Sequence, residues 1–70
     1  MQIKDIYNVM DLSSVSRFVI TPKTQSILGV SPSSGRFVSI NTSDRDKISQ
    51  ILDIEVEQIS ILDNMMYITV

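Results

Sequence analysis

The 70-residue sequence contains no cysteine, no histidine and no tryptophan. Without cysteine there can be no disulfide and no thiolate metal site, and without histidine the commonest general base and metal ligand is missing. No spacing of the remaining serine, lysine and carboxylate residues singles out a nucleophile with its base. We therefore expect no enzyme activity and no catalytic residue, and we predict neither a bound metal nor a cofactor.

Glycine and proline are also scarce, with two of each, whereas 43% of the residues are hydrophobic. Such a chain is too apolar to remain disordered, so we predict one small domain spanning residues 1–70. A domain of this length is near the lower limit for independent folding, which favours a homodimer. No apolar run approaches the roughly 18 residues that span a bilayer, and the first residues do not resemble a signal peptide. We expect a cytoplasmic protein.

The predicted fold class is α+β, beginning with a short helix. Ile3, Ile6, Tyr7 and Met10 have the spacing of one helix face, and the run LSSVS at residues 12–16 is expected to end that helix. Three segments rich in β-branched and aromatic residues follow, and they predict a three-strand antiparallel meander: residues 16–21, 25–30 and 36–41. Between the last two, Gly35 suits a left-handed position and Pro32 an early turn position.

A second helix and a hairpin complete the predicted fold. The helix is expected at about residues 44–52, with Thr42 or Ser43 as N-cap. Residues 58–62 and 65–70 are then predicted to form two strands joined by a two-residue turn at Asp63 and Asn64. That turn predicts three cross-strand pairs: Leu62 with Met65, Ile61 with Met66, and Ile59 with Ile68.

The two faces of this hairpin differ in character. One face holds Ile59, Ile61, Met66 and Ile68, which form a coherent core face. The other is less polar than a solvated face should be. Either a helix covers this second face within the monomer, or it is a contact surface for a dimer or partner, through the apolar residues Leu62, Met65 and Tyr67.

Acidic residues are concentrated in the last third of the chain. Residues 48–70 contain no base, although the net charge of the whole chain is only −2. The aliphatic residues change parity between Val56 and Ile59, so a break or bulge is expected near Glu57 and Gln58. On either side of it the carboxylates should lie on the surface, as a short anionic row with a fourth acid at the turn: Asp53, Glu55, Glu57 and Asp63.

The near-repeat SRFV and GRFV raises a nucleic-acid-binding alternative. It would use the bases Arg17, Lys23 and Arg36. Adjacent residues of a strand point to opposite faces, so each arginine should be separated from the phenylalanine that follows it. We therefore predict that Phe18 and Phe37 lie in the core and that both arginines are solvated.

In size, composition and its anionic segment, the whole chain resembles the small early host-takeover proteins of large lytic bacteriophages. It is similar within that group to inhibitors of the bacterial nucleoid protein HU that act as dimeric DNA mimics. The resemblance implies a location in the host bacterial cytoplasm or nucleoid and a basic host DNA-binding protein as partner.

The resulting functional hypothesis is a homodimeric inhibitor that binds protein rather than nucleic acid or membrane. Its contact residues are expected to be Asp53, Glu55, Glu57 and Asp63, and Asp44 and Asp46 come second because helix capping also explains them. A two-fold dimer would present each carboxylate twice. The alternative is a structural or regulatory dimerisation module that acts through Leu62, Met65 and Tyr67.

Overall fold

The structure is a computed structural model that describes residues 1–10 and 14–70. Its elements in chain order are α1 (Ile3–Tyr7), β1 (Arg17–Thr21), the 3₁₀ turn η1 (Pro32–Ser34), β2 (Val38–Asn41), α2 (Arg45–Ser49), β3 (Gln58–Leu62) and β4 (Met65–Thr69). The protein is therefore of mixed α+β class, with a four-stranded sheet and two short helices, as the sequence predicts in outline.

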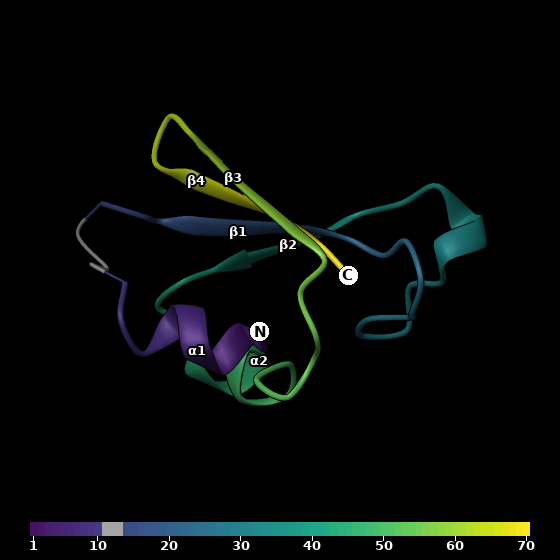
Figure 1. The fold of residues 1–70 in the computed structure, drawn as a ribbon, viewed down its shortest axis with the longest axis horizontal. Coiled ribbons are helices and arrows are strands. Elements are labelled where there is room, and N and C mark those ends of the chain that lie inside the picture. Colours follow the sequence, from purple (N-terminus) through teal and green to yellow (C-terminus); the bar gives the residue numbers. More distant parts are fainter. Residues whose placement is uncertain (11–13) are drawn as a thin grey trace.

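The strand order in the sheet is β2-β1-β4-β3. The two central strands, β1 and β4, run parallel, and each outer strand is antiparallel to its neighbour. Both helices lie on the same side of the sheet (Figure 1). Among the described residues, α1 and α2 cover that side alone, so this part of the chain forms two layers.

The core lies between the sheet and the helix layer. From the sheet, Phe18 and Ile20 of β1 are fully buried, and the ring of Tyr7 in α1 meets that of Phe18 edge-on at a centroid distance of 6.3 Å. Tyr7 also donates a hydrogen bond from its hydroxyl to the carbonyl of Thr42. The remaining buried hydrophobic residues are Ile3, Ile6, Val15, Ile27, Ile40, Ile48, Ile51, Met66, Ile68 and Val70.

Both predicted helices are present, and both are shorter than the hydrophobic pattern suggests. The first ends at Tyr7, and residues 12 and 13 of the run expected to end it lie outside the described residues. The second begins after Asp44, whose carboxylate accepts a hydrogen bond from the backbone N–H of Lys47. Asp44 is therefore the N-cap, and the prediction of Thr42 or Ser43 was wrong. Thr42 is buried instead, with its hydroxyl donating to the carbonyls of Val15 and Ser16.

The predicted three-strand meander was wrong in its middle strand. Within residues 25–30, the chain reverses in a tight turn between Ile27 and Val30, which make an isolated bridge, because Leu28 and Gly29 both have positive φ. This segment contributes the buried side chain of Ile27 to the core without joining the sheet. Strands β1 and β2 therefore pair directly, and Gly35 adopts the predicted left-handed conformation at the end of η1, with φ 71°.

The C-terminal hairpin was predicted correctly. Strands β3 and β4 pair in the expected register, with Leu62 opposite Met65, and Asp63 and Asn64 form the turn. The expected break is also present, because Glu57 lies at a bend and β3 begins only at Gln58. The core face of the hairpin is incomplete, however. Ile61 is 62% exposed, whereas Met66 and Ile68 are buried.

Candidate interaction surface

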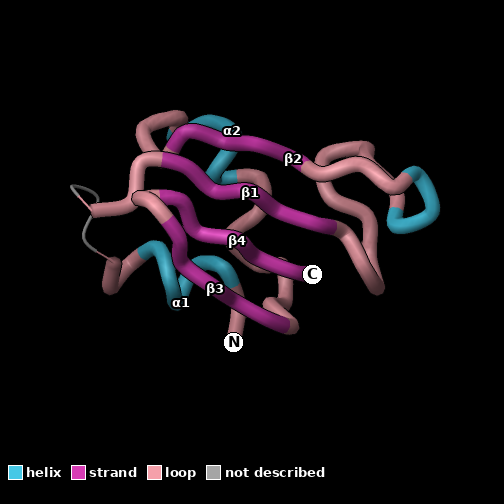
Figure 2. The backbone as a smooth tube through the Cα atoms, turned by 90° about the horizontal axis from the view of Figure 1, so that it is seen from above, coloured by secondary structure: helices cyan, strands magenta, loops and turns pink. Residues whose placement is uncertain are grey.

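The side of the sheet that the helices do not cover is the candidate site. Figure 2 looks down onto this side, with the strands in front of the helices. Because residues alternate along a strand, the buried Phe18 and Ile20 leave Arg17, Val19 and Thr21 pointing outward. The strand registers extend this surface across the sheet, and we call it the open face: Arg17, Val19, Thr21, Phe37, Ser39, Asn41, Gln58, Ser60, Leu62, Met65, Tyr67 and Thr69.

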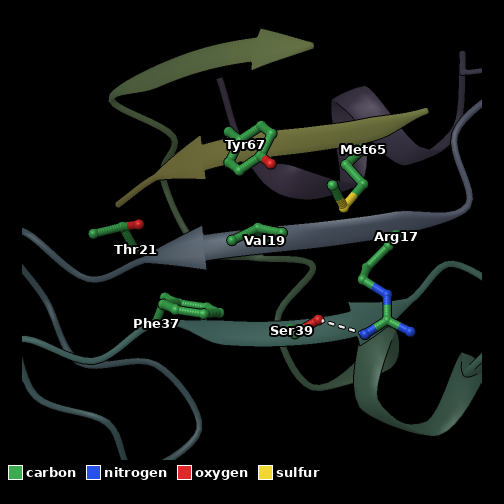
Figure 3. A pocket seen from close by; sticks show the side chains of 7 residues that line it. All are labelled: Arg17, Val19, Thr21, Phe37, Ser39, Met65 and Tyr67. Atoms are coloured by element: carbon green, nitrogen blue, oxygen red, sulfur yellow. Dashed lines mark hydrogen bonds between the residues drawn. The ribbon is translucent and has the colours of Figure 1, made fainter. Parts of the chain in front are cut away.

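A depression of about 550 Å³ occupies the middle of the open face. Figure 3 shows its lining, in which Val19 lies at the centre between Phe37 on one side and Tyr67 on the other. Arg17 extends toward β2 and donates a hydrogen bond from Nη1 to the hydroxyl of Ser39 at 2.8 Å. The complete lining is Arg17, Val19, Thr21, Phe37, Ser39, Met65 and Tyr67.

Phe37 is the clearest departure from the sequence prediction, which placed it in the core. The residue is 62% exposed and lines the depression. The physical reason is its register: Phe37 precedes β2 and alternates with Val38, so it shares the outward orientation of Ser39. Phe18 is fully buried and Arg17 is exposed, as predicted. Since Arg17 and Phe37 share one face, alternation does not separate this cation from this ring.

The apolar contact residues predicted from the sequence are brought together on the open face. Leu62 and Met65 lie directly opposite each other, and Tyr67 follows on β4. Leu62 is 60% exposed, while Met65 and Tyr67 are half-buried. Of the two alternatives for this surface, coverage by a helix of the monomer was wrong, because both helices pack on the opposite side (Figure 1).

The three predicted carboxylates of residues 53–57 are exposed, and each has a cation nearby. Lys4 Nζ lies 3.5 Å from Asp53, and Lys23 Nζ lies 3.6 Å from Glu57. The amino group of Met1 lies 3.1 Å from Glu55. Exposed pairs of this kind contribute little to stability, but they reduce the negative potential of the row.

The other predicted acidic residues do not join this row. Asp63 lies in the turn between β3 and β4. Asp44 caps α2, and Asp46 lies in the first turn of that helix, where its negative charge is favourable. The structure therefore separates the six predicted acidic residues into the row, the turn and the helix start. The basic residues are dispersed as well, because Lys23 is engaged with Glu57 and only Arg17 lies on the open face.

Two kinds of site are missing from the described residues. No group of three or more carboxylates is placed to hold a metal ion there. No helix within residues 1–10 and 14–70 is long and apolar enough to cross a membrane.

Comparison with protein-family models, curated proteins and solved structures gives no match for this chain. The surface chemistry therefore supplies the evidence for function.

Sequence reasoning missed Val19 and Phe37 as site residues. The alternation of RFVIT was visible, and it separates Phe18 and Ile20 from Val19 and Thr21. Assigning Val19 to an uncovered surface, however, requires knowing that β1 is central and that both helices pack on its other side. For Phe37, an exposed position just before β2 gives no local signal in the sequence that distinguishes it from a core residue.

Proposed function

We propose that the protein is a non-enzymatic homodimerisation module whose open face packs against the same face of a second copy. The observation that carries the proposal is an exposed sheet face with an apolar centre. Large apolar side chains on an uncovered face favour association, and a chain of 70 residues gains stability by burying them. Two such faces packed together form a sandwich, with their side chains interleaved across about 10 Å.

The distribution of charge on the open face supports a second copy as the occupant. Arg17 is the one charged residue among those that form the face, and it lies at the opposite end from Phe37. We place a two-fold axis in the plane of the interface, perpendicular to the strands and passing through Val19. This axis brings the Arg17 end of one sheet over the Phe37 end of the other. The guanidinium then lies over an aromatic ring in two symmetric cation–π contacts.

The inhibitor hypothesis is a second proposal, in which the acidic residues occupy the basic site of a nucleoid protein such as HU. The observation that favours it is that Asp53, Glu55, Glu57 and Asp63 are exposed and absent from the open face, so a dimer leaves them accessible. The cations beside three of them weaken it, because a DNA mimic depends on uncompensated negative charge. Dimerisation therefore receives the stronger support.

The dimer is tested by replacing one valine on each side of the molecule. Val19→Lys places a charge at the centre of the open face, whereas Val9→Lys makes the same change at a residue outside that face that is 84% exposed. We expect the unchanged protein and Val9→Lys to sediment as concentration-dependent dimers in analytical ultracentrifugation, and Val19→Lys to sediment as a monomer. A monomeric unchanged protein, or a dimer that Val19→Lys leaves intact, contradicts the proposal.

A further inference from the structure

The outer edge of β3 is unpaired, because β3 pairs with β4 on one side and no described strand lies on the other. The hairpin turn determines which backbone groups face this edge. Asp63 and Asn64 have φ of 51° and 65°, as a type I′ two-residue turn requires. In such a turn the flanking residues, Leu62 and Met65, exchange both backbone hydrogen bonds.

Hydrogen-bonded pairs alternate along an antiparallel ladder, so the remaining backbone groups of β3 can be assigned. Ser60 and Gln58 lie opposite Tyr67 and Thr69, so this alternation assigns their backbone hydrogen bonds to β4, like those of Leu62. The N–H and C=O groups of Ile59 and Ile61 therefore face outward. These two residues present four hydrogen-bonding groups to any extended chain that lies alongside.

Within β3, the edge lacks the features that usually prevent strand addition. Its five residues, QISIL, include no charge and no proline, and the break in the chain lies before Gln58. Its last two side chains are exposed on opposite faces of the sheet, with Ile61 62% and Leu62 60% accessible. An added strand would cover apolar surface on both faces and complete the hydrogen bonding of the edge.

The charges flanking β3 identify the kind of strand that fits. Glu57 precedes the strand and Asp63 follows it. Lys23 Nζ lies 3.6 Å from Glu57 in an exposed ion pair, whereas no cation of the described residues forms an ion pair with Asp63. The two acids are six residues apart, which corresponds to about 20 Å in an extended chain. We infer that the outer edge of β3 binds an extended segment of a partner protein that has an uncharged, β-branched middle and a Lys or Arg at each end, six residues apart.

A second copy of β3 is the other possible occupant, and its charges oppose the pairing. In one antiparallel register, Ile59 of each chain lies opposite Ile61 of the other. This register uses all the outward backbone N–H and C=O groups of both strands. It also places Glu57 of each chain opposite Asp63 of the other. Like charges directly opposite each other destabilise a strand pair, and this register contains two such pairs. A basic segment instead places a cation opposite each acid. At Asp63 it meets no competing cation of the described residues, and at Glu57 it competes with the exposed Lys23.

This inference is independent of the proposed dimer. Packing through the open face stacks two sheets and leaves the β3 edge at the rim of each, so a monomer and a dimer offer the same edge. Sedimentation tests the dimer, and peptide binding tests the edge. Failure of one measurement therefore leaves the other prediction standing.

The probe is the blocked synthetic peptide Lys-Thr-Val-Thr-Val-Thr-Lys, with the analogue that has Glu at both ends as control. We expect the lysine peptide to bind the full chain at least about tenfold more tightly than the glutamate peptide in fluorescence anisotropy, with the difference decreasing as salt is added. In hydrogen exchange, the lysine peptide should protect the amides of Ile59 and Ile61. Equal binding of the two peptides, no binding, or protection confined to other amides would overturn the inference.

Two substitutions at Ile61 distinguish the contribution of its backbone N–H to peptide binding from the contribution of its side chain. Ile61→Pro removes an outward N–H without removing a bond to β4, whereas Ile61→Ala shortens the same side chain and keeps the N–H. We expect the proline variant to bind the lysine peptide at least about tenfold more weakly and the alanine variant to remain within about threefold. Equal losses in the two variants contradict strand addition. If the proline variant does not fold, hydrogen exchange in the unchanged protein decides the question.

Discussion

Replacement of Phe37 by alanine distinguishes a core residue from an interface residue. A phenylalanine exposes roughly 200 Å² when free, so with 62% of it still accessible about 80 Å² is buried within the monomer. At about 25 cal/mol per Å² that burial contributes about 2 kcal/mol, part of which alanine retains. Phe37→Ala should therefore lower the free energy of unfolding by about 1 kcal/mol, compared with about 3–5 kcal/mol for a buried phenylalanine.

The same change should have a larger effect on association. The accessible part of Phe37 is about 120 Å², and covering it in the dimer contributes at most about 3 kcal/mol per protomer. Allowing for the surface that alanine retains, the loss is about 1–2 kcal/mol per protomer and about 2–4 kcal/mol per dimer, since each residue is used twice. The dissociation constant should rise by about 30-fold to 1,000-fold.

Urea unfolding at low protein concentration measures the first quantity, and sedimentation across a concentration series measures the second. Ile61→Ala is the matched control, because Ile61 has the same 62% exposure on the opposite side of the sheet. We expect it to leave the dissociation constant within about threefold of the original. An unfolding loss of about 3 kcal/mol or more would place Phe37 in the core, and an unchanged dissociation constant would refute its role in the interface.

Two further predictions concern the loop before β2 and the acidic row. Gly35→Ala should lower the free energy of unfolding by about 1 kcal/mol, measured by urea denaturation. Gly35 has a φ of 71° and an added Cβ meets no atom, so the cost is conformational strain alone. A loss above about 3 kcal/mol would indicate a steric clash instead. Reversing Glu55 and Glu57 to lysine should abolish retention on an immobilised basic DNA-binding protein, measured by elution in a salt gradient, while changing the unfolding free energy by less than about 1 kcal/mol. Unchanged retention would mean that the acidic row is not the contact surface.

The parts of the fold that the sequence predicts are those set by short-range rules. The hairpin follows from strict alternation on each side of a two-residue turn, so its register is fixed by the turn. Likewise, the change of parity between Val56 and Ile59 locates the break before β3. The segment 25–30 failed because its aliphatic residues resemble a strand, whereas the positive φ of Leu28 and Gly29 reverses the chain within it.

The candidate site was only half predictable for a related reason. Leu62, Met65 and Tyr67 share a hairpin face, which local alternation reveals. Val19 joins them only because β1 pairs with β4, a contact between distant segments that no local pattern encodes. The exposure of the acidic row was predicted from the sequence, but its cations Lys4 and Lys23 come from remote parts of the chain. Surface charge could therefore be located from the sequence, whereas its neutralisation could not.

The central pairing of β1 with β4 also has a consequence for how the protein folds. Ser16, next to β1, hydrogen-bonds to Asn64 across 48 positions of sequence, so the middle of the sheet closes a long loop. During synthesis β1 can pair with β2 early, but its second neighbour, β4, becomes available only when residues 65–69 have emerged. Chains rich in such distant contacts fold slowly for their size. Until residues 65–69 have emerged, the nascent chain leaves one edge of β1 unpaired, and unpaired strand edges of this kind are prone to aggregate.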